Sequence, residues 1–124
     1  MPATPQLQLI CTDFDGTLHS DFTEPAVPIA LQVKLRELQD KGVKWIINTG
    51  RTLEDLQYGL DKADLSVHPD YVVVVEREIH RYEGDEFIPH NEWNTRCAAA
   101  QAALFAHISD RLPEIFEWVN LHFT

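Results

Sequence analysis

The fold of this chain is constrained most by three short apolar runs. Two stretches separate them, in which leucines recur at the spacing of a helix. The runs cover residues 7–12, 43–48 and 71–75, and valine fills four of the five positions of the last one. Between them, leucines recur every three or four residues, at Leu31, Leu35 and Leu38 and again at Leu53, Leu56 and Leu60. Strand, helix, strand, helix, strand is typical of parallel sheets joined by right-handed crossovers. The pattern therefore predicts an α/β fold built on a three-layer, Rossmann-like parallel sheet.

Residues with strong positional preferences predict where these helices begin and end. Pro28 suits the first turn of the first helix, and Gly42 suits the position just after its end. Thr52 is expected to cap the second helix, with Asp55 stabilising its first turn. Beyond residue 75 we expect a hairpin that turns at Gly84, an alanine-rich helix over 92–108, a break at Pro113 and a short helical stretch over 115–121.

Length and composition limit the domain organisation and the kinds of partner. The 124 residues suit one partial domain, with core strands and helices over 1–90 and a helical segment over 91–124. The sequence has no apolar run long enough to cross a membrane and no secretory start, so we expect a cytoplasmic protein that binds no membrane. Its formal net charge of -10 argues against nucleic acid as a partner. Of the two cysteines, Cys11 lies in an apolar run and is expected to be buried.

Two aspartates directly follow the first apolar run. In parallel sheets, ligands bind at the carboxyl ends of the strands, and Asp13 and Asp15 are expected at that edge with Gly16 turning the chain. Paired carboxylates repel each other, and a divalent cation such as Mg²⁺ would relieve the repulsion. One carboxylate could attack phosphorus while the other transfers protons. The cation would also let an acidic protein bind an anionic substrate.

The segment Leu9 to Leu18, which ends Asp-Phe-Asp-Gly-Thr-Leu, resembles the first signature of the haloacid dehalogenase (HAD) superfamily of hydrolases. The resemblance implies that Asp13 is the nucleophile and Asp15 the general acid and base of a phosphatase. It also implies that Mg²⁺ binds the Asp13 carboxylate and the backbone carbonyl of Asp15. Further residues of the segment are implied to bind phosphate, namely Phe14, Gly16 and Thr17.

A second segment, Ile46 to Arg51, resembles the second signature of the same family. In that signature a Ser or Thr ends the second strand and hydrogen-bonds the phosphoryl group, which implies phosphate contacts at Thr49, Gly50 and Arg51. The Thr-Gly-Arg form is similar to the subgroup of Cof-type and sucrose-phosphate phosphatases. Taken alone, these residues would indicate only a turn and a surface cation.

The two later signatures of the family are absent from this sequence. The last lysine is Lys62, before the third run, and Gly84-Asp85-Glu86 is expected to be a hairpin turn rather than the second acidic pair. The resemblance therefore covers residues 7–90, the first half of such an enzyme, and 91–124 could begin its cap. The edge beside the first strand would then be free, so we expect a homodimer, a partner, or the 92–108 helix to cover it.

Three functions follow from these patterns. The first is a Mg²⁺-dependent phosphohydrolase that acts on a small phosphorylated metabolite, such as a sugar phosphate. The second is a chain that binds phosphate or Mg²⁺, or assembles with a partner, without turnover. The third, a response-regulator receiver, is disfavoured because its phosphorylated aspartate would follow the third strand, where Glu76 and Arg77 stand instead.

Overall fold

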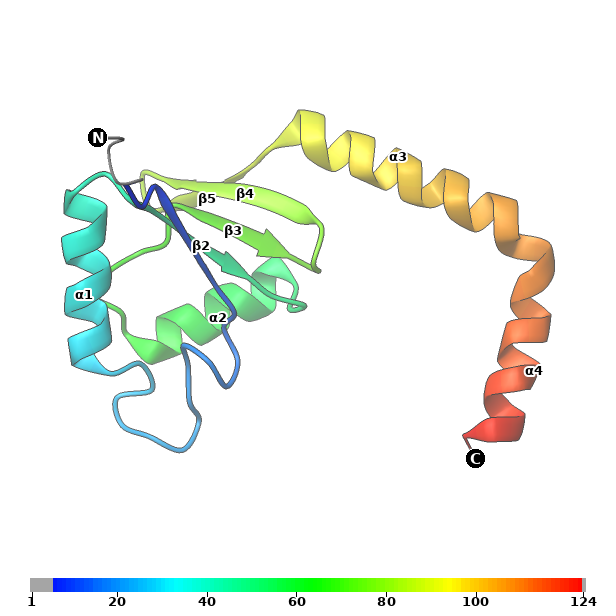
Figure 1. Cartoon of the computed structure of the whole chain (residues 1–124), viewed down its shortest axis with the longest axis horizontal. Coiled ribbons are helices and arrows are strands. Elements are labelled where there is room, and N and C mark those ends of the chain that lie inside the picture. The colour runs from blue at the N-terminus through cyan, green and yellow to red at the C-terminus, as the bar shows by residue number, and fades with distance from the viewer. Residues whose placement is uncertain (1–5, 124) are drawn as a thin grey trace, which may run out of the picture. The chain divides into compact units, whose positions relative to one another are not determined.

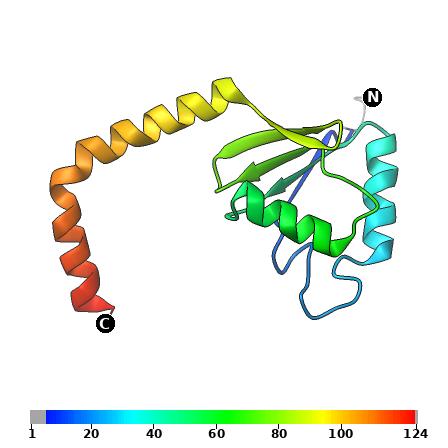
Figure 2. The ribbon, with the colours of Figure 1, turned by 180° about the vertical axis from the view of Figure 1, so that it is seen from behind.

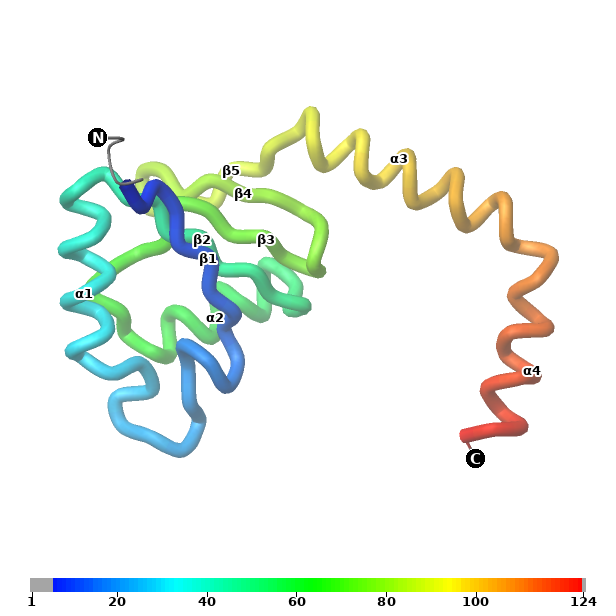
Figure 3. Tube along the Cα trace, in the orientation of Figure 1, coloured from blue at the N-terminus to red at the C-terminus, as the bar shows by residue number. Residues whose placement is uncertain are grey.

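The computed structural model describes residues 6–123, and the chain divides into two compact units, residues 1–90 and 91–124. The first unit holds one five-stranded sheet and two helices (Figures 1 and 3). In chain order its elements are β1 (Leu9–Thr12), α1 (Ile29–Asp40), β2 (Lys44–Asn48), α2 (Leu53–Ala63), β3 (Tyr71–Val74), β4 (Glu78–Glu83) and β5 (Glu86–Pro89).

The strands follow one another across the sheet in sequence order, β1-β2-β3-β4-β5. The pairs β1–β2 and β2–β3 are parallel, whereas β3–β4 and β4–β5 are antiparallel. The predicted α/β class, the parallel arrangement of the first three strands and the hairpin are therefore confirmed. Among the described residues β1 pairs only with β2, which leaves its other edge free as expected.

The helix ends lie where the local sequence predicts them. Pro28 directly precedes α1, and Gly42, at a φ of +88°, follows the end of that helix. The Thr52 hydroxyl accepts a hydrogen bond from the Asp55 amide at 3.2 Å and so caps α2. Each of these residue types favours a backbone conformation or a hydrogen bond that a helix end requires. The helix ends could therefore be predicted from the sequence.

Both helices pack on the same face of the sheet, which Figure 2 shows from the helix side. Alternate residues of β2 and β3 point to that face, including Trp45, Ile47 and Val72, and all are buried. Leu35 of α1 and Leu56 of α2 belong to the same hydrophobic cluster. Burial of these large side chains supplies the main driving force for folding.

The opposite face of the sheet carries no helix from residues 6–90, so this unit has two of the three expected layers. Cys11 points to that open face and is exposed. Our prediction that Cys11 is buried was therefore wrong, because an apolar run does not reveal whether both of its faces are covered. Leu9 on the same strand is also about half exposed.

The turn between β4 and β5 contains Gly84 and Asp85, which both have a positive φ, of 60° and 64°. Two consecutive residues of this kind form the tight turn that suits the twist of a hairpin. Gly84-Asp85-Glu86 is thus a turn, as predicted, and lies within the β4–β5 hairpin.

The second unit consists of helices. These are α3 (Asn91–Ile108), a 3-10 turn (Ser109–Arg111) and α4 (Leu112–His122), which has Pro113 in its first turn. None of their described residues is buried, so of the three tryptophans only Trp45 lies in the core. Helix α4 is longer than the turn or two predicted. Within residues 6–123, no helix is both long and apolar enough to span a bilayer.

His80 of β4 makes stability depend on pH. Its side chain is buried, and neither ring nitrogen has a hydrogen-bond partner among residues 6–123. Nε2 lies 4.0 Å from the Glu78 carboxylate. Burial lowers the pKa of His80 below the ordinary value of 6.5, and Glu78 only partly opposes this effect. As the pH falls below 6.5, the unfolded chain therefore takes up a proton that the folded chain resists.

We expect the free energy of unfolding to fall as the pH is lowered from 7 to the pKa that His80 has in the folded chain. The substitution His80→Leu should make this loss smaller. The exposed His107→Leu is the matched control and should leave the pH dependence unchanged. Urea unfolding at several pH values measures the effect. Equal slopes in the wild type and His80→Leu would contradict this assignment.

Candidate functional site

The candidate site lies where β1 and β2 end. Because these strands are parallel, the loops that follow them leave the sheet at the same edge. A hollow of about 320 Å³ opens there. It is lined by residues of both strand ends and of the turn after β3, namely Cys11, Thr12, Asp13, Asn48, Thr49, Gly50 and Glu76.

Asp13, which lines this hollow, is held by its own loop. The Phe14 amide donates to Asp13 Oδ1 at 2.8 Å, and the Thr17 hydroxyl donates to Oδ2 at 3.4 Å. Gly16, at a φ of +75°, turns the chain as predicted. Each carboxylate oxygen accepts one of these hydrogen bonds and keeps a further lone pair, so Asp13 can still bind a cation or attack an electrophile.

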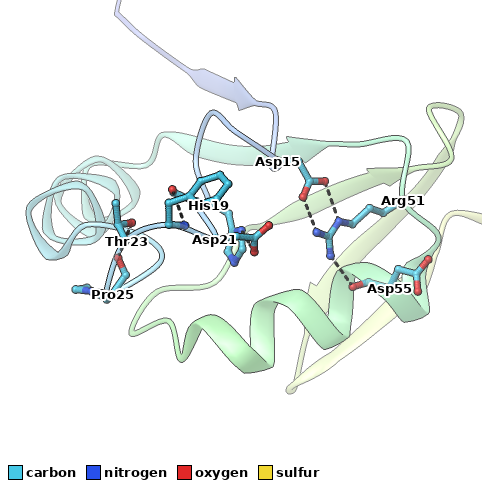
Figure 4. A network of polar contacts seen from close by, with 9 residues as sticks. Asp15, His19, Asp21, Thr23, Pro25, Arg51 and Asp55 are labelled. Atoms are coloured by element: carbon cyan, nitrogen blue, oxygen red, sulfur yellow. Dashed lines mark hydrogen bonds and ion pairs between the residues drawn. The ribbon is translucent and has the colours of Figure 1, made fainter.

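Asp15 points to a different neighbour. Its carboxylate binds the Arg51 guanidinium in a bidentate ion pair, with Nε donating to Oδ2 at 2.8 Å and Nη2 to Oδ1 at 2.5 Å (Figure 4). The hydrogen bond from Arg51 and its positive charge hold the pKa of Asp15 below its usual range. The same pair raises the pKa of Arg51. Both groups are therefore charged in the structure described.

The side chain of Phe14 anchors the loop between these two aspartates. It is fully buried and stacks on the ring of His19, with 4.8 Å between ring centroids. The amides of Leu18 and His19 both donate to the Phe14 carbonyl, which closes the loop. The carbonyl and side chain of Phe14 are therefore engaged in holding the loop, and its amide donates to Asp13, so any phosphate contact of Phe14 would have to come from this amide.

Thr49 and Gly50 lie at the end of β2, beside Asp13. Thr49 is buried, and its hydroxyl oxygen accepts a hydrogen bond from the Arg51 amide at 3.1 Å. The hydroxyl proton has no acceptor among the described residues and remains available to a ligand. Thr49 thus lines the hollow with Asp13, and its role in phosphate binding stays a prediction.

Glu76 lines the hollow but was not identified from the sequence as a site residue. Val75 and Glu76 have φ values of 45° and 60°, a conformation that non-glycine residues rarely adopt. The turn is fixed by two hydrogen bonds, from the Val75 amide to the Arg51 carbonyl and from the Glu76 amide to the Thr49 carbonyl. A charged residue after an apolar strand is too common a pattern to have signalled this role.

The structure thus divides the predicted site residues into two groups. Asp13, Thr49 and Gly50 line one hollow, whereas Asp15 and Arg51 pair with each other outside its lining. Gly16 and Thr17 lie in the exposed loop between the two aspartates. The sequence pattern alone does not reveal this pairing.

The donors around the hollow are suitable for a hard cation. Asp13 and Glu76 offer carboxylates and Asn48 an amide oxygen, which is the chemistry that Mg²⁺ prefers. Among residues 6–123, however, no three acidic, histidine or cysteine side chains are grouped so as to hold a metal. Mg²⁺ commonly binds through one or two carboxylates together with water and substrate phosphate, so these residues fit such an ion.

The strained turn gives a testable stability prediction. Glycine adopts a positive φ without steric cost, so Glu76→Gly should raise the free energy of unfolding by up to about 1 kcal/mol. Glu78→Gly is the matched control in β4 and should lower it by about 0.5–1 kcal/mol. Chemical denaturation measures both. A destabilised Glu76→Gly variant would show that the Glu76 side chain makes favourable contacts that outweigh the strain.

Comparison with known proteins places these features in a family. The family model described as haloacid dehalogenase-like hydrolase matches residues 10–96. No curated protein matches the chain.

Several solved structures share its fold. A phosphatase of the HAD superfamily from Bacteroides thetaiotaomicron is 24% identical, with a TM-score of 0.52 over 71% of this chain and 31% of that one. The sucrose-phosphatase from Synechocystis sp. PCC6803, solved with sucrose and phosphate, is 20% identical, with a TM-score of 0.59 over 86% of this chain and 41% of that one. A haloacid dehalogenase-like hydrolase from Bacillus subtilis is 20% identical, with a TM-score of 0.54 over 72% and 41%. The chain thus spans less than half the length of these structures.

Proposed function

Since this chain belongs to the haloacid dehalogenase-like hydrolases, we propose that it is the phosphate-binding half of a Mg²⁺-dependent phosphohydrolase. The substrate class is a small phosphorylated metabolite, such as a sugar phosphate. The observation that carries the proposal is the shared hollow of Asp13, Thr49 and Gly50 at the parallel strand ends. In this arrangement Asp13, the proposed nucleophile, shares the hollow with the Thr49 hydroxyl, the proposed donor to phosphate.

The chemistry proposed for these residues is phosphoryl transfer to Asp13. A carboxylate oxygen of Asp13 attacks phosphorus and forms an aspartyl-phosphate, which water then hydrolyses. The Thr49 hydroxyl donates to a phosphoryl oxygen and so holds the group in line. Asp15, once free of Arg51, takes up a proton from water and gives it to the departing oxygen. The carboxylate formed in this way then takes a proton from the attacking water.

Mg²⁺ would be held by the Asp13 carboxylate and the Asp15 backbone carbonyl, and it supplies neutralising charge for the phosphoryl oxygens. This charge is needed because the protein carries a formal net charge of -10. Glu76 adds a further carboxylate to the same hollow and strengthens the case for a cation there.

The direct test is hydrolysis of p-nitrophenyl phosphate by the full 124-residue chain with Mg²⁺. Asp13→Asn should lower turnover by roughly 10⁴-fold or more, because the nucleophile is lost. Asp15→Asn should lower it by about 10²- to 10⁴-fold, the usual contribution of a general acid. Asp40→Asn, which changes an exposed carboxylate at the end of α1, is the control and should leave turnover unchanged.

The alternative function, phosphate or Mg²⁺ binding without turnover, predicts a different result from the same assay. Phosphate would then shift the backbone amide resonances of Thr49 and Gly50. Hydrolysis would stay at the background rate in both the wild type and Asp13→Asn. The absent lysine signature favours this alternative for the chain on its own.

We also propose that the free edge of β1 pairs with a second copy of the chain. The exposed Leu9 and Cys11 support this, because unpaired edges that carry apolar side chains tend to associate. Sedimentation equilibrium should therefore give a dimer. A monomer at micromolar and higher concentrations would rule out this form of association.

A further inference from the structure

The ion pair of Asp15 and Arg51 has the geometry of an occupied anion site. Two parallel donors of the guanidinium bind both oxygens of the carboxylate, at 2.8 and 2.5 Å (Figure 4). This planar fork matches two oxygens of a phosphate group as well as it matches a carboxylate. Asp15 is therefore bound where an oxyanion from outside the chain could bind.

Arg51 is held in this position by groups other than Asp15. Its Nη1 donates to the Asp55 carbonyl at 3.2 Å, and the guanidinium lies 5.0 Å from the centre of the Phe14 ring. Gly59 of α2 leaves the space that the arginine needs. A Cβ at Gly59 would lie 2.8 Å from Nη1 of Arg51 and 3.0 Å from the Phe14 ring. Two contacts besides the ion pair thus hold the guanidinium, and Gly59 leaves room for it.

Asp15, by contrast, is free to leave. It lies in the loop after β1, its side chain is 49% exposed, and Arg51 is its only hydrogen-bond donor within residues 6–123. Because half of the Asp15 side chain is exposed, water can solvate its carboxylate when it separates from Arg51. The chain can therefore release Asp15 from Arg51 without disturbing the core.

We propose that Asp15 is an internal substitute for the substrate anion: it occupies the Arg51 fork until a phosphate oxyanion displaces it. The displacement fixes the substrate on Arg51 and frees Asp15 to reach the leaving-group oxygen. Substrate binding to Arg51 is thereby coupled to the release of Asp15, the group proposed to transfer the proton. A phosphate dianion carries more charge than the single carboxylate, which favours the exchange. This inference rests on the proposed function, since it assumes that phosphate binds at this strand edge.

Competition of this kind predicts that removing Asp15 strengthens phosphate binding. If the fork is free about one-tenth of the time, Asp15→Asn should bind inorganic phosphate about tenfold more tightly than the wild type. Titration of the intact chain with inorganic phosphate, followed by the Thr49 and Gly50 amide resonances, measures the affinity. Asp15→Ser provides a second variant that removes the same carboxylate.

Two controls separate displacement from simple charge repulsion. Asp55→Asn also removes a negative charge near Arg51 but keeps the backbone carbonyl that binds it, so its affinity should stay within about twofold of the wild type. In an Arg51→Gln background, adding Asp15→Asn should give no gain, because the fork is absent.

The outcomes distinguish this inference from the function on which it rests. Tighter binding by both Asp15 variants, lost in the Arg51→Gln background, supports the exchange. Phosphate binding with no gain in the Asp15 variants, or with a gain that persists without Arg51, overturns the exchange and leaves the proposed function standing. No shift of the Thr49 and Gly50 amides in any variant overturns both.

Discussion

The parallel pairing of β1 with β2 is the constraint on which the candidate site depends. The register sets Thr12 opposite Ile47, so Asp13 and Asn48 are the next residues at the same edge. Had the strands been antiparallel, the two signature segments would lie at opposite ends of the sheet. The pairing is stabilised by burial of one face, where Trp45 and Ile47 pack against the two helices.

Charge is the second constraint on this site. A protein with twenty acidic and ten basic residues repels phosphate unless positive charge is concentrated where the anion binds. Arg51 supplies such a charge beside the strand ends and is neutralised by Asp15 in the structure described. The acidic hollow around Asp13 and Glu76 is therefore suited to a cation, and the fork of Arg51 to an anion.

One face of the sheet is uncovered because both crossover helices of residues 6–90 lie on the other face. The crossovers β1–α1–β2 and β2–α2–β3 place both helices on one face, and nothing in residues 6–90 covers the other. The comparison structures are longer than the chain, which covers 31 to 41% of each of them. Cys11 is exposed on this uncovered face, and among the described residues the outer edge of β1 has no partner strand.

The sequence by itself determined the local structure and the residues at the strand ends. Helix ends at Pro28, Gly42 and Thr52, and the hairpin turn at Gly84, depend on preferences of single residues and their neighbours, which a sequence displays directly. Asp13 and Thr49 were predicted at strand ends because their segments resemble two signatures of a known family, and both lie where β1 and β2 end.

Only the tertiary structure decided which of these residues meet. The pairing of Asp15 with Arg51 joins positions 36 residues apart, and its geometry depends on how Phe14 and Gly59 pack. The presence of Glu76 in the hollow depends on hydrogen bonds to the loop after β2, and the exposure of Cys11 depends on which sheet face is covered. These outcomes arise from contacts between distant segments, so no pattern of neighbouring residues could have specified them.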